Sequence, residues 1–322
     1  MSHFLEVENL NITFNTRRGD LNAIRNLSFH LAKGESLGIA GESGCGKSIT
    51  SKTLLGLLPL QAKMTASKMN YDGISLLSAN EKKWQEVRGK KIAMIFQNPM
   101  TALNPSFTVE YQMMETLMTS GLYTKKQAKE ETLRLLNQVG IPDAKSRLNV
   151  YPHQLSGGMC QRIMIAMSIS LKPDLLIADE PTTALDVTIQ AQILALLKKL
   201  QEEEKMSLIL ITHDLGVVSH MTDKLMVMYA GEKIEYGKTS DIIKNPRHPY
   251  THGLLKSLPA NHHINEKLYT IEGRVPDLVN RAQGCQFAPR CAYAQQECLQ
   301  SPLVFKEPNL SCLYPLEKGN LS

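Results

Sequence analysis

The chain has 322 residues, which is enough for one large domain with an appendage or for two domains. Hydrophobic residues make up 43% of it and charged residues 21%, so it can build an ordinary globular core. The formal net charge is +5, but no run of five or more basic residues occurs. The composition therefore argues against a dedicated nucleic-acid-binding surface.

The sequence predicts neither a secretory signal nor a membrane span. The first residues, MSHFLEVENL, include Glu6 and Glu8 where a signal peptide requires an apolar run. The longest apolar stretches, such as Ile163–Leu171, reach about half of the roughly 18 residues that a span needs. We therefore expect a soluble chain that reaches a membrane only through partner proteins.

Strands and helices alternate in the first hundred residues. Leu5–Phe14 alternates apolar and polar residues, which predicts a half-buried strand. Ser36–Ala40 is a short apolar run that ends at a glycine, and Lys47–Leu58 follows as a predicted helix. Ile92–Phe96 is the next apolar strand. This order favours an α/β layered fold with a largely parallel sheet.

The middle of the chain contains a stretch without strong strand patterns. Residues from about 98 to 158 predict several helices, including Lys125–Val139, and we expect them to form a helical subdomain inserted between core strands. Leu175–Ala178 and Leu208–Ile211 are then predicted as buried strands, with a helix at Val187–Glu204 between them.

The character of the sequence changes again near residue 245. Proline and cysteine become frequent there, and the alternation of strands and helices fades. We therefore predict two domains, residues 1–244 and residues 245–322.

A glycine-rich segment follows the strand at Ser36–Ala40. It reads GESGCGKS from Gly41 to Ser48 and matches the pattern G-x-x-x-x-G-K-[ST] between a strand and a helix. Its glycines let backbone N–H groups approach phosphates, and the helix N-terminus adds partial positive charge. We expect Lys47 to reach the β- and γ-phosphates of ATP and the Ser48 hydroxyl to bind Mg²⁺. The predicted nucleotide contacts are Gly41, Glu42, Ser43, Gly44, Cys45, Gly46, Lys47, Ser48 and Ile49.

Two carboxylates end the buried strand that begins at Leu175. Asp179 at the strand tip is suited to Mg²⁺, which binds through oxygen ligands and retained water. Glu180 follows it and could orient and polarise the water that attacks the γ-phosphate. The strand could also end simply in solvated acids, but the glycine-rich loop makes that reading much weaker.

A second segment resembles a phosphate site. The run LSGGMCQ from Leu155 to Gln161 precedes a helix predicted to begin near Met159. One nucleotide does not need two such sites from one chain, so this one is expected to serve a nucleotide on another subunit. Gln97 and His213 each follow a strand, and they are candidates for contacts with Mg²⁺ or the attacking water and with the γ-phosphate, respectively.

These elements occur in the order typical of ABC ATPases, and the resemblance covers about residues 3–240. It adds a D-loop at Ala184–Asp186 and a signature at Ser156–Gln161. It implies a P-loop NTPase core with an N-terminal antiparallel β region, and a dimer that holds each ATP between one subunit's glycine-rich loop and the other's signature. An N-terminal aromatic residue is expected against adenine, and Phe14 is the candidate. The signature-side contacts that the resemblance implies are Ser156, Gly157, Gly158, Gln161 and Asp186.

The last part of the chain resembles the C-terminal extension of oligopeptide/dipeptide importer ATPases. The resemblance is carried by NPRHPYT from Asn245 and by GCQFAPRC from Gly284. Four cysteines separated by 5, 6 and 13 residues lie here, without the close pair usual in structural zinc sites. Related importers hold a [4Fe–4S] cluster on such cysteines, so we expect one, with zinc or no metal as alternatives. The predicted ligands are Cys285, Cys291, Cys298 and Cys312.

The resemblance also implies partners and a location. The chain is expected to dimerise with a second, non-identical ABC ATPase, and to dock beneath two transmembrane permeases at the cytoplasmic face of the cell membrane. An extracytoplasmic binding protein would deliver the peptide. Two alternatives remain, namely another cargo such as nickel or antimicrobial peptides, and a soluble ABC ATPase that acts on ribosomes or DNA. Such soluble proteins usually carry two cassettes or long coiled-coil inserts, and this chain has one cassette and a short insert.

Overall fold

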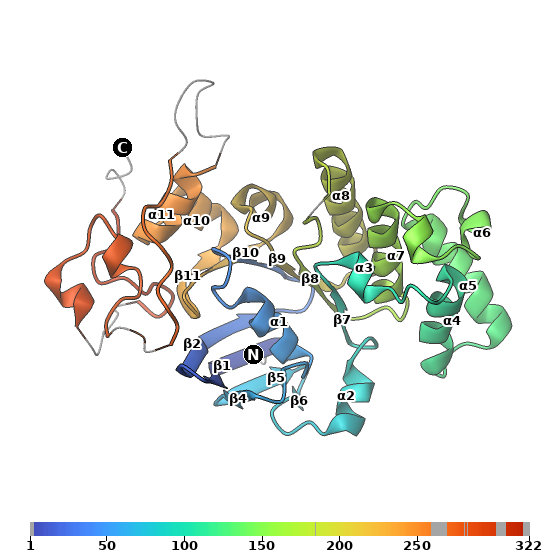
Figure 1. Cartoon of the computed structure of the whole chain (residues 1–322), viewed down its shortest axis with the longest axis horizontal. Helices are drawn as coiled ribbons and strands as arrows, with labels where there is room; N and C mark the ends of the chain where they lie inside the picture. Colours follow the sequence, from blue (N-terminus) through green and yellow to red (C-terminus); the bar gives the residue numbers. More distant parts are fainter. Residues whose placement is uncertain are drawn as a thin grey trace. The chain divides into compact units, whose positions relative to one another are not determined.

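A computed structural model of the chain describes residues 3–183, 185–258, 269–279, 281, 283–300 and 307–317. The chain divides into two compact units, and each is described by itself. The first unit consists of residues 1–79 and 210–322, and the second unit consists of residues 80–209. Figure 1 labels their helices and strands.

The first unit contains an antiparallel sheet. Its strands are paired in the order β2-β1-β5-β6, and β4 also pairs with β1. Along β1 the pattern of buried and partly exposed residues alternates, as the sequence predicted. The strand runs to Thr16, two residues beyond the prediction, because Thr16 pairs with Gly19 across a tight turn. The strands are β1 Leu5–Thr16, β2 Gly19–Leu31, β4 Ala62–Thr65, β5 Lys68–Tyr71 and β6 Ile74–Ser75.

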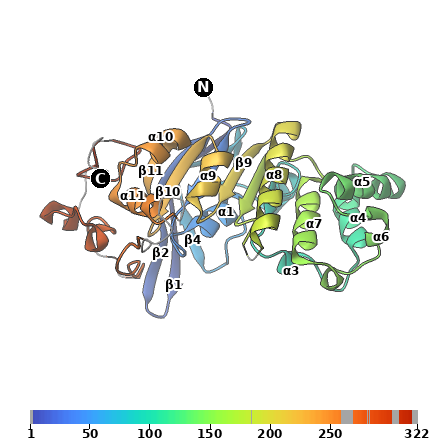
Figure 2. The same cartoon turned by 90° about the horizontal axis from the view of Figure 1, so that it is seen from above.

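Among the described residues of the first unit, the other elements of regular structure are three further strands, four α-helices and two short 3₁₀ helices. β3 (Ser36–Ala40) is buried along its whole length and lies parallel to β10 (Lys224–Tyr229), which pairs antiparallel with β11 (Glu232–Lys238). Figure 2 shows α9 and α10 lying along these strands. The helices are α1 Lys47–Leu54, α9 Leu215–Met221, α10 Thr239–Lys244 and α11 Pro249–Lys256.

Helix α1 ends four residues earlier than the sequence predicted. Gly56 has φ of 62°, a left-handed conformation that glycine adopts without strain. The N–H of Gly56 donates to the Thr53 carbonyl at 3.0 Å, and the N–H of Leu57 donates to the Lys52 carbonyl at 2.9 Å. These two bonds form a Schellman C-cap, so the chain leaves the helix after Leu54.

The described part of the C-terminal segment packs on the first unit. Leu310 forms a β-bridge with Glu235, and the Ser311 N–H donates to the Ile234 carbonyl at 2.8 Å. Phe287 and Tyr250 are buried in one hydrophobic cluster that includes strand β10. Two short 3₁₀ helices, η3 (Ala288–Arg290) and η4 (Gln296–Leu299), lie in this segment. The contacts group the residues beyond 245 with the first unit and do not separate them as a domain. The boundary near residue 245 therefore stays a prediction.

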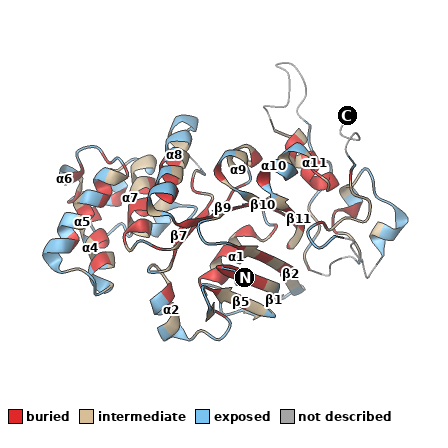
Figure 3. Cartoon of the chain, turned by 180° about the vertical axis from the view of Figure 1, so that it is seen from behind, coloured by how far each residue is buried: buried red, intermediate tan, exposed pale blue. Residues whose placement is uncertain are grey.

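The second unit pairs β7 in parallel with β8, and helix α7 packs against β7. Every element between these two strands is helical, and α4 and α5 turn their buried sides inward and their exposed sides outward (Figure 3). Strand β9 (Ser207–Ile211) contains the division between the units. The elements are α2 Glu81–Val87, β7 Ile92–Ile95, α3 Pro99–Ala102, α4 Val109–Thr119, α5 Lys125–Gln138, α6 Ala144–Arg147, η1 Pro152–Gln154, α7 Gly157–Ile169, β8 Leu175–Asp179 and α8 Val187–Glu204.

Helix α7 begins at Gly157, two residues before the predicted start at Met159. The reason is the side chain of Ser156, whose hydroxyl oxygen accepts the Met159 N–H at 3.3 Å and caps the helix. Among the helices that the structure describes, none is both long enough and apolar enough to cross a membrane.

Candidate functional site

The glycine-rich loop connects β3 to α1, as the sequence predicted. Gly41 has φ of 152°, and a Cβ there would lie 2.8 Å from the Cys45 sulfur and closer still to the Met228 carbonyl oxygen. Gly46 has φ of 104° and directly precedes the first residue of α1. Only glycine fits both positions, so the loop backbone stays close-packed and can approach phosphates without side chains between.

The Lys47 side chain lies over this loop. It is only 5% exposed, and its ammonium donates to the Gly41 carbonyl at 2.7 Å and to the Glu42 carbonyl at 3.1 Å. The two bonds place a positive charge where the loop is expected to receive phosphates. The Cys45 sulfur is buried beside it, and burial raises the pKa of this thiol, which agrees with a packing role.

The two predicted carboxylates lie at the C-terminal end of strand β8 in the second unit. Asp179, its last residue, is 4% exposed. Glu180 has φ of 47°, a left-handed conformation that is uncommon for a residue with a side chain. Such backbone strain is often concentrated at functional sites, and here it turns Glu180 away from the strand direction.

The structure brings Glu180 and Gln97 together. The Gln97 amide donates from Nε2 to Glu180 Oε2 at 2.9 Å. The Thr183 hydroxyl donates to the same oxygen at 2.8 Å. Two hydrogen bonds therefore hold one side of the carboxylate in place, in the way a base that orients a water molecule is held. The sequence analysis did not identify Thr183, although its spacing of three residues from Glu180 was visible.

The signature segment forms the start of α7. Ser156 and Gly157 are exposed at this helix end, and a Cβ on Gly158 would lie 3.0 Å from Ile189. The Gln161 side chain is buried, and within the described structure its Nε2 atom has no hydrogen-bond partner. The N-terminus of this 13-residue helix is thus available to an anion.

The remaining predicted residues occupy separate places. Asp186 caps α8 by accepting the Ile189 N–H at 3.0 Å, and Ala184 of the predicted D-loop lies outside the described residues. His213 follows β9 and is exposed in the first unit. Phe14 is half-buried on β1, opposite Leu21.

The four tail cysteines converge without forming a metal-binding group. They line one small cavity together with His248 and Phe287. Burial raises the pKa of the Cys285, Cys291 and Cys312 thiols, to about 11 for Cys285 and Cys312, and the neighbouring thiols act in the same direction. Among the described residues, no three His, Cys, Asp or Glu side chains are arranged to hold a metal ion. The predicted [4Fe–4S] cluster is therefore not supported by this geometry, since the sulfur atoms would have to rearrange around it. The cysteines are Cys285, Cys291, Cys298 and Cys312.

One contact to the glycine-rich loop was missed by the sequence analysis. The Arg290 guanidinium pairs with the Glu42 carboxylate at 2.7 Å. The segment GCQFAPRC was noted for its cysteines, and nothing local in it shows where its arginine points. A contact across 248 residues of sequence arises only from the fold.

Comparisons with known proteins agree with this arrangement. Residues 24–183 match the ABC transporter family, and residues 234–298 match the oligopeptide/dipeptide transporter C-terminal region. The chain is 49% identical to the dipeptide transport ATP-binding protein DppD of Haemophilus influenzae, over 98% of this chain and 97% of that protein. It is 46% identical to the oligopeptide transport ATP-binding protein OppD of Salmonella typhimurium, over 98% of this chain and 94% of that protein.

Solved structures show the same fold. The ATP-binding cassette MJ0796, in a dimeric post-hydrolysis state bound to ADP and Pi, superposes with a TM-score of 0.66 at 27% identity. The match covers 73% of this chain and 98% of that chain. The cassette cbiO1 of Clostridium perfringens, part of the transporter complex cbiONQ, gives 0.64 at 26% identity and covers 76% of this chain and 92% of that chain. The α/β fold with an antiparallel sheet and helices is thereby confirmed.

Proposed function

Because the chain belongs to the family of ABC transporter ATPases that carry an oligopeptide/dipeptide transporter C-terminal region, we propose that it powers an importer of di- and oligopeptides. The observation that carries this proposal is the match of residues 234–298, since an ATPase core by itself does not specify a cargo. We also propose that residues 1–244 form the ATPase domain with a helical subdomain at about 98–158, and that residues 245–322 form the importer-type extension.

The roles of the core residues follow from the chemistry of phosphoryl transfer. Lys47 donates to the β- and γ-phosphates, and the close-packed loop at Gly41 supplies backbone N–H groups. The Ser48 hydroxyl, Asp179 and Gln97 are the oxygen donors proposed for Mg²⁺, which when bound neutralises phosphate charge. Their donor chemistry fits this ion, because Mg²⁺ prefers carboxylate, hydroxyl and amide oxygens.

Three residues are proposed to position the attacking water, the γ-phosphate and the adenine ring. Glu180 orients and polarises the attacking water, and its contacts with Gln97 and Thr183 support this role. His213 donates a hydrogen bond to the γ-phosphate. Phe14 stacks on adenine, and its partial exposure on β1 is compatible with that contact.

The signature is proposed to complete the site of a neighbouring ATPase. The exposed N-terminus of α7, formed by Ser156 and Gly157, supports this role, because a helix N-terminus attracts anions. Gly158, Gln161 and Asp186 belong to the same proposed surface. Hydrolysis then requires two ATPase subunits, each of which supplies half of both sites.

The proposed assembly contains two permeases, a second, non-identical ATPase, and an extracytoplasmic peptide-binding protein. The chain would sit peripherally at the cytoplasmic face of the cell membrane, with the helices that follow Gln97 coupling it to a permease. Import of nickel or of antimicrobial peptides by the same assembly type is the alternative cargo, and action on ribosomes or DNA is the less favoured class.

A paired isolation and uptake experiment tests this function. We expect the tagged chain, isolated from detergent-solubilised membranes, to carry two permeases and a related ATPase. Cells that lack the chain should lose uptake of a labelled dipeptide while labelled nickel still enters, and the restored wild-type chain should return dipeptide uptake. Copurification with ribosomes, or a loss confined to nickel uptake, would contradict the peptide function.

The cysteine cavity is proposed to hold a [4Fe–4S] cluster in the assembled protein. Four thiols that line one cavity supply the right donors in the right number, although they must rearrange and lose their protons. Such a cluster would connect the four cysteines, which lie at separate positions in the sequence of the C-terminal segment.

Iron analysis of anaerobically purified protein tests the cluster. We expect broad absorbance near 400 nm and about four irons per chain. Cys298→Ser should lose most of the iron and colour, whereas Cys160→Ser, a substitution in α7 outside this cavity, should keep both. Colourless protein that contains zinc or no metal would refute the proposal.

A further inference from the structure

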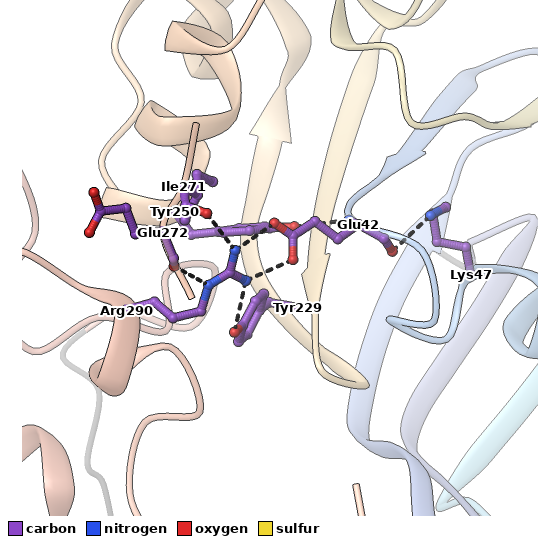
Figure 4. A network of polar contacts seen from close by, with 7 residues as sticks. All are labelled: Glu42, Lys47, Tyr229, Tyr250, Ile271, Glu272 and Arg290. Carbon is purple, nitrogen blue, oxygen red and sulfur yellow. Dashed lines mark hydrogen bonds and ion pairs between the residues drawn. The ribbon is translucent and has the colours of Figure 1, made fainter. Parts of the chain in front are cut away.

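Arg290 in the C-terminal segment is held in place by a dense set of contacts (Figure 4). Its Nη1 and Nη2 atoms donate to the two oxygens of the Glu42 carboxylate, at 2.7 and 3.0 Å. The same guanidinium donates to the Glu272 carbonyl at 2.9 Å, the Ile271 carbonyl at 3.2 Å and the Tyr229 hydroxyl at 3.2 Å. A bidentate pair of this kind fixes geometry as well as charge.

Glu42 is the second residue of the glycine-rich loop, and all four of its polar atoms have partners. Its N–H donates to the Tyr250 hydroxyl at 2.9 Å, and its carbonyl accepts from the Lys47 ammonium at 3.1 Å. Its carboxylate accepts from Arg290. Residues beyond position 245 therefore bind the N–H and the carboxylate of Glu42, and Lys47 binds its carbonyl oxygen.

These anchors lie in a desolvated environment. Arg290 is 6% exposed in its side chain, and its guanidinium lies 5.7 Å from the Tyr229 ring and 6.0 Å from the Phe287 ring. Tyr250 is fully buried, with its ring centroid 4.7 Å from that of Tyr229. Removal from water strengthens such polar contacts and makes their loss costly.

The charge of Glu42 gives this contact a consequence for nucleotide binding. An unpaired carboxylate in a phosphate-binding loop repels the negative charges of ATP. With Arg290 in place the carboxylate is neutralised and turned toward the C-terminal segment. The backbone of Glu42 then stays where its carbonyl can hold the Lys47 ammonium over the loop.

We propose that Arg290, supported by Tyr250, is a positioning residue for nucleotide binding, and that it acts by holding and neutralising Glu42 in the glycine-rich loop. The C-terminal segment thereby takes part in the ATP site without contacting the nucleotide. Because Cys291 directly follows Arg290, the same contact links the cysteine cavity to the loop through one peptide bond.

Nucleotide titration of the full-length chain tests the proposal. Arg290→Gln should raise the Kd for a fluorescent ATP analogue about tenfold, and the KM for ATP should rise with less change in kcat. Arg290→Lys keeps the charge but not the bidentate geometry, so it should raise the Kd about threefold. In the Arg290→Gln background, Glu42→Gln should return the Kd to within about threefold of the wild-type value, because the uncompensated negative charge is gone.

Arg281→Gln is the matched control. Arg281 also lies beyond residue 245, is 5% exposed in its side chain and pairs with a glutamate, Glu232 of β11, rather than with the loop. It should lower the unfolding temperature but leave the Kd of the folded protein unchanged. The binding stoichiometry of each variant separates lost folding from lost affinity.

Three outcomes would overturn the proposal. They are an Arg290→Gln Kd within twofold of wild type, a Kd for Arg281→Gln raised as much as that for Arg290→Gln, and a double variant no tighter than Arg290→Gln alone. If Arg290→Gln does not fold, the Kd of Arg290→Lys decides, and an unchanged value refutes the positioning role.

Discussion

Glu180→Gln should lower ATP turnover by the assembled transporter about 10³-fold while ATP still binds. The amide keeps the size of the side chain but cannot polarise the attacking water, and loss of a general base typically costs about 10²–10⁴-fold. The phosphate-binding loop belongs to the other unit and is unchanged, so affinity for ATP is expected to remain. Phosphate release under saturating ATP and the Kd for ATP measure the two effects.

The variant should also accumulate as an ATP-bound ATPase dimer, because in the proposed mechanism ATP binding closes the dimer and hydrolysis reopens it. Glu202→Gln is the control, since this exposed glutamate on α8 in the same unit lies 3.9 Å from the Lys198 ammonium. It should leave turnover unchanged. Normal turnover by Glu180→Gln in the assembled transporter would remove Glu180 from the proposed mechanism.

Gly41→Ala should disrupt the glycine-rich loop and strongly weaken nucleotide binding. The new methyl group would overlap the Met228 carbonyl oxygen and lie 2.8 Å from the Cys45 sulfur, at a φ of 152° that side chains rarely adopt. Crowding and backbone strain together should cost about 3 kcal/mol of unfolding free energy. A loop displaced by roughly 1 Å should weaken ATP binding about 10²-fold. Thermal unfolding and nucleotide titration measure these two losses.

Gly44→Ala separates crowding from backbone strain. Gly44 also has positive φ, 79°, but a Cβ there meets nothing within 4 Å. This variant should lose only about 1 kcal/mol, which is the strain contribution alone. Equal destabilisation by the two substitutions would show that close packing at Gly41 does not explain its glycine.

Local patterns predicted those elements whose signals are contiguous in the sequence. The glycine-rich loop, strand β3 and helix α8 occur where they were predicted, because turn glycines, apolar runs and an N-cap act over a few residues. The errors at the ends of α1 and α7 also had local causes. Gly56 and Ser156 are capping residues, and a cap sets the end of a helix independently of its apolar periodicity.

Side-chain partners were decided by packing between distant segments. The sequence named Gln97 and Glu180 separately. Gln97 follows β7 and Glu180 follows β8, and the parallel pairing of these two strands explains why the two side chains form a hydrogen bond. The four tail cysteines were recognised from spacing, and the fold showed that they line one cavity without forming a metal-binding group in the described residues.

The sequence by itself determined that this chain is an ABC ATPase with a C-terminal region of the oligopeptide/dipeptide transporter kind, because the motifs that bind and hydrolyse ATP are short and contiguous. Tertiary structure alone decided that the C-terminal segment reaches the ATP-binding loop, where Arg290 holds Glu42 and Tyr250 accepts its N–H. Contacts such as these join residues more than 200 positions apart, and their geometry depends on the folding of everything between them.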